Sequence, residues 1–210
     1  MKLLILYLAL VSCGSCRKDI VEYNAGEIKV EIEAGDQWLH DFPLFMGIKK
    51  KNAPQIAIWA EDEEGNYLST IYVSHKIATQ SWTASGGNRR RESLPHWSYL
   101  RGIQYSDGLY LPTKDEPLTD GISGATPTGS FDMKIVPVSG LQKFVVKIEL
   151  NHSTDFNDAY PKSAQPGEAG YSGGKMGSGQ PALVYEVRVD LSSGQKTFVA
   201  DLLGHSSPDG

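Results

Sequence analysis

Apolar and polar side chains alternate with a period of two along much of the chain, the pattern of strands with one buried and one solvated face. Residues 27–33 are the first such segment, with isoleucine and valine alternating with charged residues. Residues 54–62 are followed by a turn at 63–66 and a second apolar run at 67–75, which predicts a hairpin. The remaining segments with a strand pattern are 131–138, 142–151, 182–191 and 195–203.

About seven strands and no long helical stripe predict an all-β fold, an immunoglobulin-like or fibronectin-like antiparallel β-sandwich. Residues 79–128 and 151–180 have no strand pattern, and we predict two long loops there. The positions expected to form the core are Ile28, Val30, Ile32, Ile56, Ile58, Ile71, Val73, Val145, Ile148, Val184 and Val187. In the strand at 54–62, Ala57 and Trp59 are expected on the face opposite the two isoleucines.

The chain begins MKLLILYLALVSCGSC, which has the features of an export leader. Lys2 supplies a positive start, and the apolar run at 3–11 is too short to span a bilayer. The run ends in LVSC, which resembles a lipobox, so Cys13 is the predicted lipidation site. Several acyl chains on one cysteine bind a membrane firmly. An ordinary signal peptide cut elsewhere, for instance before Cys16, is the alternative.

This pattern divides the chain into a lipoprotein signal peptide (1–12), a polar tether (13–26) and a single β-sandwich domain (27–205). We expect the mature protein outside the cytoplasm, in the periplasm or at the outer membrane, held to the membrane by its lipid anchor. With Cys13 acylated, Cys16 is the one other cysteine, so no intrachain disulfide can form. The 22 glycines, 11 prolines and ten tyrosines suit a loop-rich β protein. A net charge of −5 and a pI near 5.5 argue against a nucleic-acid partner.

Four segments of the chain carry a family resemblance: PQIAIWAEDEEGNYLSTIYVSH, SLPHW, SGATPTG and GQPALVYEVRVD. Together they resemble an uncharacterised family of periplasmic β-sandwich domains, a bacterial domain of unknown function often found near flavin-dependent membrane redox systems. The similarity extends over most of residues 50–205. It implies a β-sandwich fold and an extracytoplasmic location.

Residues 120–126, DGISGAT, resemble the D-x-x-S/T-G-A-T motif at which a flavin transferase attaches flavin mononucleotide (FMN) covalently. The resemblance makes Thr126 the acceptor and Asp120 the acidic residue recognised or used during the transfer. The small linker residues between them are Ser123, Gly124 and Ala125. It implies FMN as the cofactor, and a flavin transferase and a membrane redox protein as partners. The protein would then carry electrons, with the chemistry supplied by the flavin.

The alternative is that this segment is only a turn leading into a strand, with Gly124 and Gly129 at positive φ. The protein would then be a non-catalytic lipoprotein that binds or scaffolds a membrane or redox partner. No residues indicate a catalytic site: there is no G-x-S-x-G elbow, and neither Ser123 nor Ser130 has an assignable His/Asp pair. No metal site is expected, because no histidine has metal-ligand spacing to another His or Cys.

Three weaker signals have structural interpretations that we prefer. Residues 89–91, three arginines, could bind a phosphate but are expected in a solvated loop. Residues 151–158 are polar and acidic and are expected to form Asx turns rather than a calcium loop. The aromatic residues around His96 and Trp97 could cover a ligand, and are expected to be a small satellite core.

Overall fold

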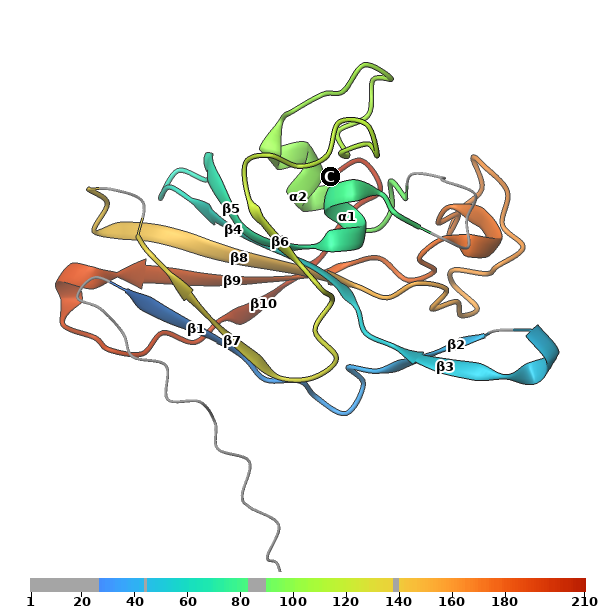
Figure 1. Cartoon of the computed structure of the whole chain (residues 1–210), viewed down its shortest axis with the longest axis horizontal. Helices are drawn as coiled ribbons and strands as arrows, with labels where there is room; N and C mark the ends of the chain where they lie inside the picture. Colours follow the sequence, from blue (N-terminus) through green and yellow to red (C-terminus); the bar gives the residue numbers. More distant parts are fainter. Residues whose placement is uncertain (1–26, 44, 83–89, 138–139) are drawn as a thin grey trace, which may run out of the picture.

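The computed structural model describes residues 27–43, 45–82, 90–137 and 140–210 (Figure 1). The predicted signal peptide, the tether and the lipidation site Cys13 lie outside the described residues. Within the described ranges, no helix combines the length and the apolar character needed to cross a bilayer.

A six-stranded sheet forms the body of the fold, in the order β10-β9-β8-β4-β5-β6. Its strands are β4 (Gln55–Glu61), β5 (Tyr67–Ser74), β6 (Ile122–Gly124), β8 (Lys143–Asn151), β9 (Leu183–Asp190) and β10 (Asp201–His205). Neighbouring strands are antiparallel except β6, which is parallel to β5. Two smaller antiparallel pairs are β1 (Ile28–Ile32) with β7 (Phe131–Ile135), and β2 (His40–Pro43) with β3 (Lys49–Asn52).

Helical structure is limited to short segments in the described residues. These are α1 (His75–Thr79), α2 (Pro95–Arg101) and three single turns at Phe45–Gly47, Gly174–Met176 and Leu191–Ser193. The prediction of a mostly β fold is therefore confirmed.

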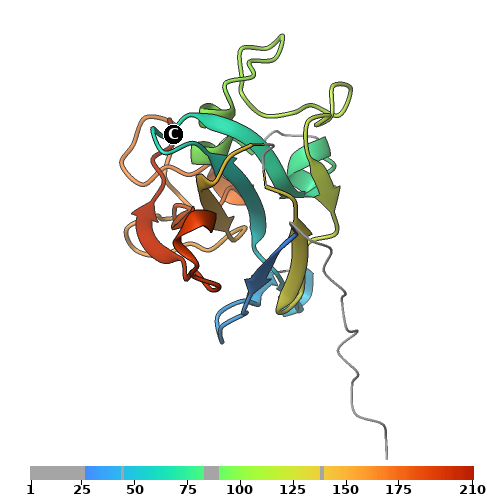
Figure 2. The same ribbon diagram turned by 90° about the vertical axis from the view of Figure 1, so that its left-hand side faces the viewer.

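One face of the six-stranded sheet is covered by the β1–β7 pair (Figures 1 and 2). The alternation in β1 is the reason: Val30 and its apolar neighbours in the strand pack against the cluster containing Ile56 and Ile58. β7 contributes Met133 and Ile135 to the same cluster. The charged residues of both strands are left facing solvent, where Lys29 pairs with two carboxylates.

The opposite face of the sheet is covered by α1 and α2 (Figure 2). Ile77 of α1 and Trp97 of α2 are both fully buried against Ala57 and Trp59 of β4. Pro95 starts α2, where the missing N–H costs nothing. The helix ends at Gly102, whose φ of 72° is in the left-handed region that favours glycine.

β4 is consequently buried over its whole length, with cover on both faces. The predicted alternation of its apolar residues is confirmed, since Ile56 and Ile58 lie in one core cluster and Ala57 and Trp59 in the other. The partner strand β5 is less regular. A β-bulge lies opposite Ile58 and Trp59. Because of it, Ile71 packs into the cluster of Ile56 and Ile58, whereas Val73 packs into the cluster of Ala57 and Trp59.

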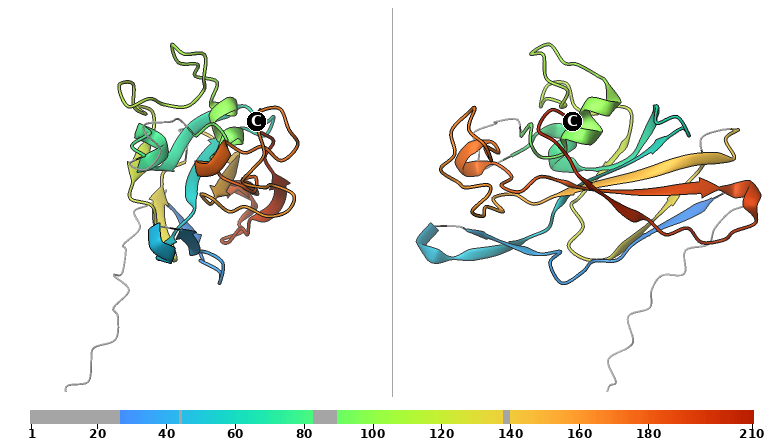
Figure 3. Two further views of the ribbon diagram at one scale, coloured as in Figure 1. Left: turned by 90° about the vertical axis from the view of Figure 1, so that its right-hand side faces the viewer. Right: turned by 180° about the vertical axis from the view of Figure 1, so that it is seen from behind.

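The hairpin of β2 and β3 extends beyond the end of the six-stranded sheet, beside the segment that follows β8 (Figure 3). Its residues include three consecutive lysines, all exposed, so it has no alternating pattern by which the sequence could reveal it. The long segment predicted as a loop at 79–128 contains α2 and β6 as well as irregular structure. The other, at 151–180, is irregular apart from one helical turn.

Candidate functional site

The predicted acceptor motif, residues 120–126, lies in a segment (118–130, here the acceptor segment) at the β6 edge of the six-stranded sheet (Figure 1). Its central part is β6, whose Ile122, Ser123 and Gly124 pair with Tyr72, Val73 and Ser74 of β5. A backbone bond from Leu118 N to Ala78 O, 2.9 Å, fixes its beginning on α1. β6 has a partner strand on one side only, and Ile122 is 70 % exposed. The segment is therefore held by the fold and accessible from outside.

Asp120 is held by Arg101 of α2. Arg101 Nε donates to both carboxylate oxygens, at 2.9 and 3.2 Å, and Nη2 donates at 2.6 Å. The Arg101 side chain is 2 % exposed, its guanidinium lies 5.8 Å from the Trp97 ring centroid, and it also donates to Tyr105 Oη. Partial burial alone would raise the pKa of Asp120, but the Arg101 hydrogen bonds and charge hold it below its usual value. In this structure Asp120 anchors the acceptor segment to the protein itself.

We expect Asp120→Asn to lower the free energy of unfolding at pH 7 by about 1 kcal/mol, because Arg101 loses its counterion while the pair is partly solvent-screened. The native pKa of Asp120 is depressed, so its stabilising effect is present above the ordinary value of 3.8 and is lost as the pH falls through the native pKa. Urea denaturation at pH 7 and pH 3 tests this. Asp115→Asn, at an exposed position of the same region, is the matched control. An equal loss at both pH values would contradict it.

Gly124 lets the acceptor segment approach Tyr72 closely. A Cβ at Gly124 would lie 3.0 Å from a ring carbon of Tyr72, and Tyr72 Oη donates to Ala125 O at 2.7 Å. Neither Gly124 nor Gly129 has a positive φ, so the expectation that they adopt left-handed backbone in a simple turn is wrong. Gly124 is instead part of an extended strand that needs space beside an aromatic ring.

Thr126, two residues after Gly124, is half-buried. Within the part of the chain that the structure describes, its hydroxyl has no hydrogen-bond partner. The next residues are tied to a distant segment: Pro127 O accepts from Trp38 Nε1 at 3.0 Å, and Ser130 Oγ accepts from Ala34 N at 2.9 Å. The chain on the C-terminal side of Thr126 is thus fixed to residues 34–38.

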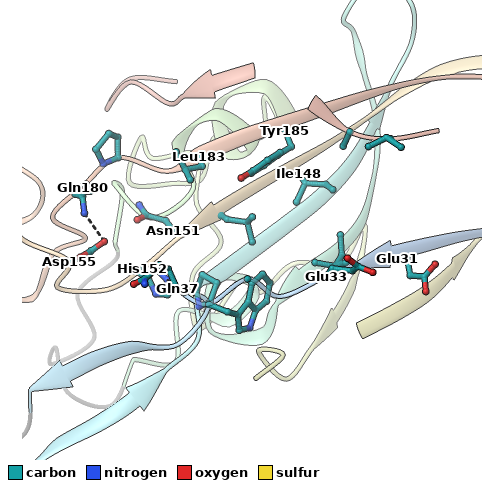
Figure 4. A pocket seen from close by; sticks show the side chains of 18 of the residues that line it. Glu31, Glu33, Gln37, Ile148, Asn151, His152, Asp155, Gln180, Leu183 and Tyr185 are labelled. Carbon is teal, nitrogen blue, oxygen red and sulfur yellow. Dashed lines mark hydrogen bonds between the residues drawn. The ribbon is translucent and has the colours of Figure 1, made fainter. Parts of the chain in front are cut away.

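Those residues border a groove of about 670 Å³ on the face of the sheet that carries β1 and β7 (Figure 4). We call this the sheet groove. Its apolar surface is contributed by β8, β9, the segment after β1 and the segment before β10: Trp38, Ile148, Leu150, Leu183, Tyr185, Phe198 and Val199. Glu31 and Glu33 lie at one side of it.

The other end of the sheet groove is polar, with Asn151, His152, Asp155 and Gln180 close together (Figure 4). Gln180 Nε2 donates to Asp155 Oδ2 at 2.8 Å, and His152 Nε2 lies 3.2 Å from Gln37 O. Burial, and then the neighbouring His40, lower the pKa of His152. Its Nδ1 is buried without a hydrogen-bond partner in the described part of the chain.

The weaker signals have structural explanations where the structure describes them. Arg90 is buried and donates to Ser153 and Ser178, so the expectation of a solvated loop is wrong for this residue, and it cannot bind a surface phosphate. Asn157 Oδ1 accepts from the backbone N–H groups of Ala159 and Tyr160, as in an Asx turn. Among the described residues, no group of three or more His, Cys, Asp or Glu side chains could hold a metal ion.

The aromatic residues near His96 belong to the core cluster under α2, with Trp97 fully buried and the rings of Trp59 and His96 5.7 Å apart. Trp82 packs at the edge of the same cluster, with the Arg90 guanidinium 4.7 Å from its ring. They do not line the sheet groove.

The structure brings the predicted site residues to one edge of the sheet but gives them separate surroundings. Asp120 faces Arg101, whereas the chain after Thr126 faces Trp38. Sequence reasoning missed Arg101 and Trp38, which lie in no motif and act through contacts with residues far along the chain. It singled out residues 151–158 as polar but did not place Asn151, His152 and Asp155 at the end of a groove. Comparison with known proteins gives no relative: no family model, no curated protein and no solved structure matches this chain.

Proposed function

We propose that this protein is an extracytoplasmic electron carrier that holds FMN covalently through a phosphoester on Thr126. The proposal includes the lipid anchor on Cys13 and a sandwich-like body, in which β1 and β7 face the six-stranded sheet. The observation that supports it best is the setting of DGISGAT: a held, accessible edge segment that continues into a contact with the sheet groove.

The residues at the segment fit the attachment of FMN. The Thr126 hydroxyl is the chemical group that a phosphoester needs, and it has no competing hydrogen bond among the described residues. Ile122 and Ser123 are exposed on the unpaired side of the sheet, so a second protein can approach the segment. In the transfer, Thr126 Oγ would attack the FMN phosphorus of FAD, losing its proton as AMP leaves.

Once bound, FMN would accept and release electrons, and the protein would hold it at a membrane surface for redox partners. The chain's own part is positional. Arg101 and Asp120 fix the segment on one side of the acceptor, and Trp38 fixes it on the other. Two anchors flanking the acceptor threonine would limit how far an attached group could move.

Co-expression with a flavin transferase tests the proposal. We expect intact mass to rise by one FMN less one water, with in-gel flavin fluorescence in the same band. Thr126→Ala should abolish both signals, and Thr126→Ser, which keeps a hydroxyl, should retain them in part. Thr128→Ala, two residues along and exposed, is the matched control and should be fully modified. No mass gain in the wild type, or a gain that survives Thr126→Ala, would overturn the assignment.

A second function, non-catalytic binding of a ligand or partner, is favoured by the sheet groove itself. Its largely apolar surface with a few polar groups at its two ends is typical of small-molecule sites. The two functions differ in one result, because a pure binding protein would stay unmodified in the presence of the transferase.

A further inference from the structure

We propose that the sheet groove is a binding site for a flavin ring system, the planar three-ring isoalloxazine. We call this binding site the seat. This inference rests on the proposed function for its ligand class. It goes further in assigning a non-covalent site that is distinct from the attachment residue.

The lining of the sheet groove suits a flat aromatic ring system. A flat aromatic ring needs apolar surface on its faces, and the sheet groove offers Ile148, Leu150 and Leu183 together with the rings of Trp38 and Tyr185. Aromatic pairs add about 0.5–1.5 kcal/mol to the burial of their area. The volume of about 670 Å³ is in the range of pockets that hold ligands of this size.

The apolar and polar parts of the groove match those of the ring system. The isoalloxazine has an apolar dimethylbenzene end and a pyrimidine end with one N–H between two carbonyl groups. The groove is apolar in its middle, around Ile148 and Tyr185, and polar at the end with Asn151, His152 and Gln180, while Glu31 and Glu33 lie at the other side (Figure 4). Asn151 and Gln180 line this end with side-chain amide groups, which can pair with the N–H and carbonyl groups of the ring.

The sheet groove is connected to the acceptor residue through Trp38. Trp38 lines the groove and donates its indole N–H to the carbonyl of Pro127, the residue after Thr126. A flavin joined to Thr126 would therefore start beside a groove-lining side chain. The covalent link would raise the local concentration of the ring at the groove, so even a weak site would be occupied.

Riboflavin, which lacks the phosphate and cannot be attached, tests the seat in protein made without a transferase. We expect saturable quenching of riboflavin fluorescence by the full mature chain. Leu183→Arg, which places a charged side chain in the groove, should weaken binding at least tenfold. Leu203→Arg is the matched control, because Leu203 is similarly exposed, at 58 % against 44 %, and lies outside the sheet groove. No saturable quenching, or equal affinity in both variants, would overturn the seat.

The same pair of variants in flavin-modified protein separates this inference from the proposed function. We expect unchanged mass gain in Leu183→Arg but at least twofold greater quenching of the attached flavin by iodide than in the wild type or Leu203→Arg. A mass gain with equal iodide quenching in all three proteins would overturn the seat and leave the attachment standing. Absence of any mass gain would overturn the attachment, while riboflavin binding would still decide the seat.

Discussion

The free energy of unfolding should fall as the pH is raised from about 4.5 to about 8, and Glu149→Gln should remove most of that fall. Glu149 of β8 is completely buried under the start of α2. Its two oxygens accept from the backbone N–H groups of His96, at 3.2 Å, and Trp97, at 2.8 Å. Burial raises the pKa of Glu149 from 4.5 to about 8, although both backbone N–H groups lower it.

The direction follows from proton linkage. Between the unfolded pKa of about 4.5 and the folded pKa of about 8, the native state binds more protons than the unfolded state, so stability falls with rising pH. One pKa unit is worth about 1.4 kcal/mol, so the total effect is several kcal/mol. Glutamine is neutral throughout this range. Glu149→Gln should therefore be less stable than the wild type at pH 4.5, since one N–H of α2 loses its acceptor, and similar or more stable at pH 8.

Urea denaturation at half-unit steps from pH 4.5 to 8.5 measures this difference. Glu64→Gln, at the exposed tip of the β4–β5 hairpin, serves as the control and should follow the wild-type profile. Parallel pH profiles for the wild type and Glu149→Gln would show that Glu149 is not the group that titrates.

Trp97→Ala should destabilise the protein by about 3–5 kcal/mol, the range for removing a large buried aromatic side chain. Trp97 is fully buried between α2 and the sheet, and its indole N–H donates to Thr70 Oγ1 at 3.0 Å. The Arg101 guanidinium lies near the same ring, so the support of the Asp120 anchor is lost with it. Thermal or urea unfolding gives the magnitude.

A milder variant separates the packing of Trp97 from its hydrogen bond. Trp97→Phe keeps most of the buried ring and loses the N–H, so it should cost clearly less than Trp97→Ala. Thr70 Oγ1 retains its 2.6 Å contact with Tyr67 Oη, and is not left without a partner. Equal losses in the two variants would show that the hydrogen bond, rather than the burial of the ring, dominates at this site.

The alternation of residue types predicted the strands of the core because burial acts on local pattern. β1 and β4 have apolar residues on the expected faces, and the predicted positions in β8 and β9 are buried or half-buried. Glu149 shows the limit of this reasoning. It alternates with apolar residues and so looks like a solvated position, but α2 covers that face of the strand. Nothing in the local sequence of β8 indicates that the seven-residue helix α2 packs against this strand.

The sequence predicted the motif of the candidate site but not its position in the fold or the residues around it. DGISGAT is visible in the sequence, and the structure describes all seven of its residues at the sheet edge. The parallel pairing of β6 with β5, the Arg101 anchor and the Trp38 contact all join segments far apart in the chain. The sheet groove has the same origin, since its walls come from five separate stretches of sequence. Single-sequence patterns do not encode such contacts.

The central place of β4 has a consequence for the order of folding. β4 can join its hairpin partner β5 early, because the connecting turn is short, but its other neighbour β8 is made much later in the chain. Until β8 is made and the β1–β7 pair forms, the apolar run QIAIWA has an open backbone edge and at least one uncovered face. Such non-local closure is slow, and an uncovered apolar strand is a template for pairing between chains. A newly made chain would therefore be prone to self-association at this strand until the C-terminal half is complete.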